Sequence, residues 1–146
     1  MTIESIELWQ RRARPAPTDS DFNIALAVHL EELAEMFEVL SVSDGRKDVS
    51  FPLWCTIKAL SDGLKAGEMH ATINPGEREA FLDALADQIV TAVGVGHCAG
   101  MQTAEAVARV NTSNWSKTVD GEFLRDAQGK ITKPAAYVKP DLKGLY

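Results

Sequence analysis

The segment from His29 to Glu38 contains four glutamates, at Glu31, Glu32, Glu35 and Glu38. In a helix, residues three or four positions apart share a face, so Glu35 shares a face with both Glu31 and Glu32. Like charges at this spacing destabilise a helix, and no Lys or Arg lies within one turn of these residues to offset them. We therefore expect a metal ion or a partner to supply the missing positive charge.

A second acidic pair, Asp83 and Asp87, is spaced four residues apart and also shares a helix face. The pair flanks Leu85, Ala86 and Ile89, which we expect to be buried, so the carboxylates are candidates for a cluster in a groove between helices. Hard oxygen ligands of this kind suit Mg²⁺ or Mn²⁺, which also keep waters or bind substrate phosphates. The alternative is that both acidic segments are solvated faces of ordinary helices. A ferritin-like di-iron site would need Glu-x-x-His on two helices, which neither acidic segment has.

A polar stretch from 111 to 117 offers groups suited to a nucleotide. Asn111 and Asn114 carry paired donors and acceptors that match a base edge, a sugar hydroxyl or a phosphate oxygen. Lys117 is suited to binding a phosphate as a point charge, whereas we expect Trp115 to be core. The alternative is a helix C-cap followed by a turn, where Asn and Ser are common.

The elements that must position these residues are helices. Apolar spacings of three and four predict helices over 22–42, 51–64, 77–99 and from Thr103 to Asn111 or Asn114, preceded by a short amphipathic helix within 1–10. We expect Asp19 or Ser20 to cap the second helix, and we expect the glycines at 94, 96 and 100 to allow close helix–helix approach.

After Ser116 the pattern changes to an extended tail. Turn pairs occur at 120–121 and 128–129, and two short strands are predicted at 123–124 and 130–132. The predicted fold class is all-α, a four- to five-helix bundle with an extended, partly hairpin C-terminal tail. We expect one domain over 1–146, with a helical core over 20–116 and the tail over 117–146.

Composition excludes several classes of function. The 146 residues include 21 acidic and 15 basic ones, a net charge of −6, which disfavours a protein that grips nucleic acid through its phosphates. The charge is uneven, because the tail from Lys117 is net +2 and the preceding residues are net −8. Two cysteines cannot form a disulfide scaffold, and no apolar run is long enough to span a membrane. We expect a cytoplasmic protein with reduced thiols and no membrane partner.

Taken together, these motifs resemble the MazG-like all-α nucleoside triphosphate pyrophosphohydrolases, the superfamily that includes dimeric dUTPases and phosphoribosyl-ATP pyrophosphohydrolases. The resemblance is closest to a bacterial and phage branch. It spans about residues 22 to 142 and departs from the usual Glu-x-x-Asp motif at Ala84. The motifs that carry it are Glu31-Glu32-x-x-Glu35, Asp83-Ala-Leu-x-Asp87, the Val-Asn-x-Ser-Asn-x-Ser-Lys stretch at 110–117, and a tail with Gly-Lys-x-x-Lys-Pro at 129–134, Tyr137 and Pro-Asp-Leu at 140–142.

The resemblance implies cleavage of a nucleoside triphosphate, between its α- and β-phosphates, to a monophosphate and pyrophosphate. It implies that Mg²⁺, or Mn²⁺, is the cofactor. The implied roles are metal binding by Glu32, Glu35, Asp83 and Asp87, catalysis by Glu31 and Glu35 with Glu31 orienting or deprotonating the attacking water, and substrate binding by Asn111, Asn114, Lys117, Lys130 and Lys133.

The resemblance also implies a homodimer or homotetramer. The helix predicted over 77–99, with glycines at 94, 96 and 100, also favours an oligomer, because such a helix can need a partner to complete its core. The alternative function is a non-catalytic helical module that binds nucleotide without hydrolysis or oligomerises through its acidic helices.

Overall fold

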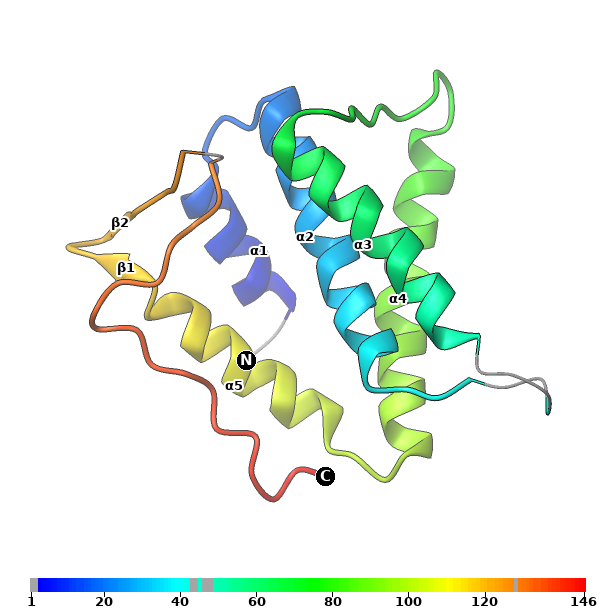
Figure 1. Ribbon diagram of the computed structural model, residues 1–146. Coiled ribbons are helices and arrows are strands. Elements are labelled where there is room, and N and C mark those ends of the chain that lie inside the picture. The colour runs from blue at the N-terminus through cyan, green and yellow to red at the C-terminus, as the bar shows by residue number, and fades with distance from the viewer. Residues whose placement is uncertain (1–2, 43–44, 46–48, 128) are drawn as a thin grey trace. The chain divides into compact units, whose positions relative to one another are not determined.

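The computed structural model describes residues 3–42, 45, 49–127 and 129–146. Within these residues the chain forms five helices followed by a small two-stranded sheet, which confirms the all-α class with a short C-terminal hairpin (Figure 1). The elements are α1 (Ile3–Ala13), α2 (Asp19–Glu38), α3 (Ser50–Ala66), α4 (Arg78–Cys98), α5 (Thr103–Trp115), β1 (Thr118–Val119) and β2 (Glu122–Phe123).

Two compact units divide the chain. One contains residues 1–15, 72–125 and 131–146, and the other contains residues 16–71 and 126–130. We call the first the α4–α5 unit and the second the α2–α3 unit, and each is described by itself. The single domain predicted from length stays a prediction.

Helix α2 begins at Asp19, three residues before the predicted start at 22. Its N-cap is Thr18, whose side chain accepts a hydrogen bond from the Asp21 backbone N–H, while the Asp21 carboxylate accepts one from the Thr18 backbone N–H. This reciprocal pair satisfies two backbone donors that the first turn would otherwise leave unpaired. The predicted caps at Asp19 and Ser20 were therefore wrong. The helix ends at Glu38, before the predicted end at 42.

The α2–α3 unit is built on the contact between these two helices (Figure 1). Small residues lie at the contact, since Ala27 and Ser61 are fully buried and Ala34 is 1% exposed. The Ser61 hydroxyl donates a hydrogen bond of 2.8 Å to the Ala27 carbonyl across the helix pair. Close approach thus depends on small side chains, and the hydroxyl that they bury has a partner.

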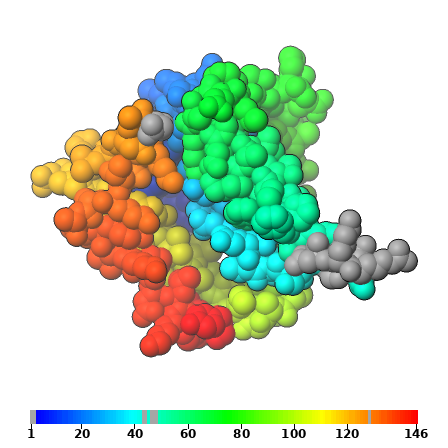
Figure 2. Space-filling view, in the orientation of Figure 1, coloured from blue at the N-terminus to red at the C-terminus, as the bar shows by residue number. Residues whose placement is uncertain are grey.

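In the α4–α5 unit, α5 lies between α1 and the tail (Figure 1). Figure 2 shows the tail, in orange and red, on the face turned toward the viewer. The Trp9 indole N–H of α1 donates to the Asn114 carbonyl at 2.9 Å. On the tail side, the Ser113 hydroxyl donates to the Val138 carbonyl at 2.6 Å and the Gln102 N–H donates to the Leu145 carbonyl at 2.8 Å. Side-chain and backbone hydrogen bonds, rather than a sheet, therefore hold the extended tail along α5.

The predicted hairpin is present in a different register. The strands β1 and β2 pair antiparallel with Thr118 opposite Phe123, and the turn places Asp120 and Gly121 at positive φ. The predicted strands at 123–124 and 130–132 are reduced to β2 and to an isolated bridge between Arg125 and Ile131. The turn predicted at 120–121 is present and connects β1 to β2. The strands predicted at 123–124 and 130–132 are joined at the isolated bridge.

Helix α4 differs most from expectation. Within it, Ala86 and Ile89 are exposed and Leu85 is half-buried, although all three were expected to be buried. Apolar residues point to several sides of this helix and are 44 to 68% exposed, namely Leu82, Ile89, Val90, Val93 and Val95. Among the described residues, no helix has the length and apolar character needed to cross a membrane.

Exposed apolar surface on this scale is typical of an interaction surface, so homo-oligomerisation stays the prediction for α4. We expect sedimentation velocity at micromolar concentration to give a dimer or tetramer, and Val90→Glu to shift it toward monomer because it places a charge among apolar side chains. A monomeric wild type would contradict the prediction.

The three glycines near the end of α4 have different environments. A Cβ on Gly96 would lie 1.8 Å from Thr103 Oγ1 and 3.2 Å from Thr103 Cβ, whereas a Cβ on Gly94 would meet nothing within 4 Å. Gly100 follows the helix with φ of +74°, where glycine is favoured. Close approach is therefore the role of Gly96 alone.

We expect Gly94→Ala to raise the free energy of unfolding by about 0.5 to 1 kcal/mol, because alanine is the better helix former. Gly96→Ala should lower it, because the steric conflict with Thr103 outweighs that gain. Urea unfolding followed by circular dichroism measures both. Equal changes in the two variants would show that the approach at Gly96 is not tight.

Candidate functional site

Helix α2 carries the predicted carboxylates in two different environments. Glu32 and Glu35 are exposed, and Glu31 is half-buried with 23% of its side chain accessible. The helix has no basic residue in its last turn. Positive charge near Glu31 therefore comes from other segments of the chain.

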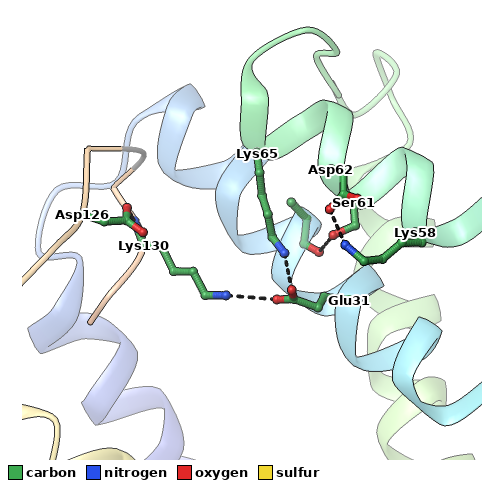
Figure 3. Close-up of polar contacts among 8 residues, drawn as sticks. Glu31, Lys58, Ser61, Asp62, Lys65, Asp126 and Lys130 are labelled. Carbon is green, nitrogen blue, oxygen red and sulfur yellow. Dashed lines mark hydrogen bonds and ion pairs between the residues drawn. The ribbon is translucent and has the colours of Figure 1, made fainter. Parts of the chain in front are cut away.

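Two lysines converge on Glu31 (Figure 3). The Lys65 Nζ of α3 lies 2.6 Å from Glu31 Oε1, and the Lys130 Nζ lies 3.1 Å from Glu31 Oε2. The Lys65 side chain is 19% exposed and that of Lys130 is 43% exposed. Each carboxylate oxygen thus accepts from one ammonium group, an arrangement that we call the Glu31 ion-pair cluster.

These contacts set the charge of Glu31. Burial alone would raise the pKa of Glu31, but hydrogen bonds from Lys65 and Lys130, together with their positive charges, lower it below its ordinary value of 4.5. A carboxylate held in this way stays ionised at neutral pH and accepts a proton poorly. The ionised carboxylate can accept hydrogen bonds, and both predicted roles for Glu31 stay predictions.

A tight turn presents Lys130 to the cluster. The Asp126 N–H donates to the Lys130 carbonyl at 2.9 Å, and the Asp126 carboxylate accepts from the Lys130 N–H at the same distance. Gly129 adopts φ of +83°, which glycine accommodates without strain. Its predicted turn partner, Gln128, lies outside the described residues.

Lys65 was missed by the sequence analysis. It lies four residues after Ser61, so it is on the side of α3 that faces α2. Lys58 and Asp62 of the same helix instead form an exposed ion pair of 2.5 Å. The sequence does place Lys65 one turn after the small residue Ser61. This spacing indicates that Lys65 faces α2 only when Ser61 is known to be buried against that helix.

The other predicted metal ligands, Asp83 and Asp87, are exposed on α4 and belong to the α4–α5 unit. Within the described part of the chain, no group of three or more His, Cys, Asp or Glu side chains is arranged to hold a metal ion. Each helix contributes a carboxylate pair, Glu32 with Glu35 and Asp83 with Asp87. Ligation by any of the four stays a prediction.

Three of the predicted substrate-binding residues gather near one aromatic ring of the tail. The Lys117 Nζ lies 5.9 Å and the Lys133 Nζ 5.2 Å from the centre of the Tyr137 ring. The Asn114 Oδ1 accepts from the Lys117 Nζ at 2.6 Å. Lys117 also lies 5.9 Å from the centre of the Trp9 ring. Both ammonium groups are thus held partly by cation–π contacts, which leaves the local charge positive.

Asn111 and Lys130 lie elsewhere. Asn111 is 2% exposed, and its amide donates to the Ser5 hydroxyl of α1 at 3.0 Å. Its Oδ1 is buried with no hydrogen-bond partner among the described residues. In this placement the side chain contributes to the contact between α1 and α5 rather than to an exposed ligand surface, while Lys130 lies in the Glu31 ion-pair cluster.

Comparison of the chain with protein-family models, with curated proteins and with solved structures found no match. The argument for function therefore rests on the residues themselves and on the motifs described above.

The Glu31 ion-pair cluster should be measurable as a coupling energy. We expect Glu31→Gln and Lys65→Met each to lower the free energy of unfolding by about 1 to 2 kcal/mol, and the double variant to lower it by less than the sum. Glu31→Gln leaves the half-buried Lys65 without its carboxylate, and Lys65→Met leaves Glu31 with Lys130 as its remaining partner in the cluster. Urea unfolding of the wild type, the two single variants and the double variant measures the coupling energy between Glu31 and Lys65. It should be present at neutral pH and be lost as the pH falls through the lowered pKa of Glu31, where the carboxyl is protonated.

The matched control is the cycle made from Lys58→Met and Asp62→Asn on the same helix α3. That pair is exposed, so its coupling should be smaller and more sensitive to salt. Equal coupling in the two cycles would mean that the Glu31 ion-pair cluster behaves as a surface contact.

Proposed function

We propose that the protein is a Mg²⁺-dependent nucleoside triphosphate pyrophosphohydrolase that releases pyrophosphate and a nucleoside monophosphate, a reaction suited to clearing unwanted nucleotides from the cellular pool. The observation that carries the proposal is helix α2, where Glu31 is engaged by two ammonium groups while Glu32 and Glu35 remain exposed. Carboxylates suit a divalent cation and ammonium groups suit phosphate oxygens. Both kinds of group occur within the α2–α3 unit.

The carboxylates fit the way in which proteins bind Mg²⁺. This ion is usually held by one or two carboxylates, with waters and substrate phosphates completing its coordination, rather than by a cage of protein ligands. Glu32 and Glu35 are three apart on one helix, exposed, and supply two carboxylates. Asp83 and Asp87 supply a comparable pair in their own unit. When bound, Mg²⁺ would neutralise the triphosphate and strengthen the α-phosphorus as an electrophile.

The chain's own residues then have distinct tasks. The Glu31 carboxylate accepts a hydrogen bond from water and orients its oxygen toward the α-phosphorus. A bond forms between that oxygen and phosphorus, the bond from the α-phosphorus to the bridging oxygen breaks, and pyrophosphate leaves with the bonding electron pair. The water's proton passes to bulk solvent, since the low pKa of Glu31 makes this carboxylate a poor acceptor.

The residues around Tyr137 support the proposal within the α4–α5 unit. Lys117 and Lys133 supply positive charge and Asn114 supplies an amide, which together suit an anionic ligand with hydrogen-bonding groups. This agrees with the substrate-binding role that the resemblance implies for the three residues.

A second candidate function is the non-catalytic interaction module, which the exposed apolar side chains of α4 favour. An interaction module that binds no nucleotide differs from the proposed enzyme in its response to ligand, whereas a module that binds nucleotide without hydrolysis differs from it only in releasing no pyrophosphate. Mg²⁺ with a non-hydrolysable nucleoside triphosphate raises the Tm of a protein that binds them in its native state. An unchanged Tm would favour the interaction module.

The direct test is pyrophosphate release from a panel of canonical and modified nucleoside triphosphates, with Mg²⁺ and then with Mn²⁺. We expect Glu35→Gln to reduce the rate by about a hundredfold or more, because it removes a metal ligand. Glu38→Gln is the matched control, since Glu38 is an exposed glutamate one turn later on α2 and should leave the rate unchanged.

Release that survives in Glu35→Gln would assign the activity to other residues or to a contaminant. Absence of release from every triphosphate with both metals would overturn the proposed function.

A further inference from the structure

The Glu31 ion-pair cluster has more positive than negative charge. One carboxylate faces two ammonium groups, and both of its oxygens are engaged, at 2.6 Å and 3.1 Å. The nearby Lys58 is paired with Asp62 on the same helix, so the net charge of the three-residue cluster stays at +1. This one positive charge belongs to the three residues of the cluster, and the exposed carboxylates of Glu32 and Glu35 lie beside it on the same helix.

The two ammonium groups also retain capacity for hydrogen bonds. Each lysine has three N–H donors and uses one of them on Glu31. Lys65 is held where solvent reaches only 19% of its side chain, so it loses little further freedom when it binds a ligand. Partly desolvated donors interact with an anion more strongly than donors in bulk water.

The cluster is also assembled from three separate segments. Glu31 comes from α2, Lys65 from α3, and Lys130 from the 126–130 turn, which internal hydrogen bonds brace (Figure 3). A carboxylate that bridges two ammonium groups fixes the distance between them. Two fixed ammonium groups match the several oxygens of a polyphosphate better than they match a single carboxylate.

We propose that Lys65, together with Lys130, binds a phosphate group of the polyphosphate ligand, and that Glu31 positions the two ammonium groups for it. The proposal rests on the proposed function for the choice of ligand and adds Lys65 as a binding residue. Neither the motifs nor the resemblance assigns a role to Lys65.

The test is binding of inorganic pyrophosphate to the full chain, measured by isothermal titration calorimetry in EDTA at fixed ionic strength. We expect Lys65→Met to weaken binding about tenfold to a hundredfold, because one charge-assisted contact is lost. Lys65→Arg should restore most of the affinity, because it keeps the charge. Lys143→Met is the control, because Lys143 is an exposed lysine of the tail outside the Glu31 ion-pair cluster, and it should bind as the wild type does.

Circular dichroism and urea unfolding must show that each variant is folded under the titration conditions, and Lys65→Arg keeps the test informative if Lys65→Met is not. No binding of pyrophosphate by the wild type, or equal binding by Lys65→Met and Lys143→Met, would overturn the inference. Because the titration uses neither metal nor turnover, its failure is distinguishable from failure of the hydrolysis assay, and either result can stand without the other.

Discussion

Lys65 can reach Glu31 only because α2 and α3 approach each other closely. The approach depends on Ala27 and Ser61, which leave no side-chain bulk between the helices, and on the hydrogen bond from the Ser61 hydroxyl to the Ala27 carbonyl. A larger residue at either position would separate the helices and withdraw Lys65, which lies one turn after Ser61. Helix packing in this unit therefore determines the electrostatics of the candidate site.

The Glu31 ion-pair cluster shows how the chain resolves the charge repulsion that its sequence creates. Four glutamates within eight positions of one helix need compensation, and part of it comes from α3 and from the 126–130 turn. Glu31 is half-buried and its charge is offset by two ammonium groups, whereas Glu32 and Glu35 stay exposed. Neighbouring carboxylates on one helix thus acquire different chemical characters, one as an ionised positioning group and two as candidate ligands for a divalent cation.

The second unit uses other means to place its polar groups. Cation–π contacts and hydrogen bonds hold Lys117 and Lys133 around Tyr137, and the tail is fixed along α5 by carbonyl acceptors such as that of Val138. The buried amide of Asn111 lies on the α1 side of the same helix. One face of α5 therefore serves the helix contact, while Lys117 and Lys133 place positive charge around Tyr137.

The sequence by itself determined the presence of the helices, the polar stretch and the turn at 120–121, because each depends on side-chain periodicity and backbone preference within a few residues. It also identified Glu31, Glu32 and Glu35 as one acidic face. Only the tertiary structure decided that Glu31 pairs with Lys65 and Lys130, that Asn111 is buried, and that the apolar residues of α4 are exposed. These outcomes depend on which helix faces come together, and that is a long-range choice set by packing, on which local spacing carries no information.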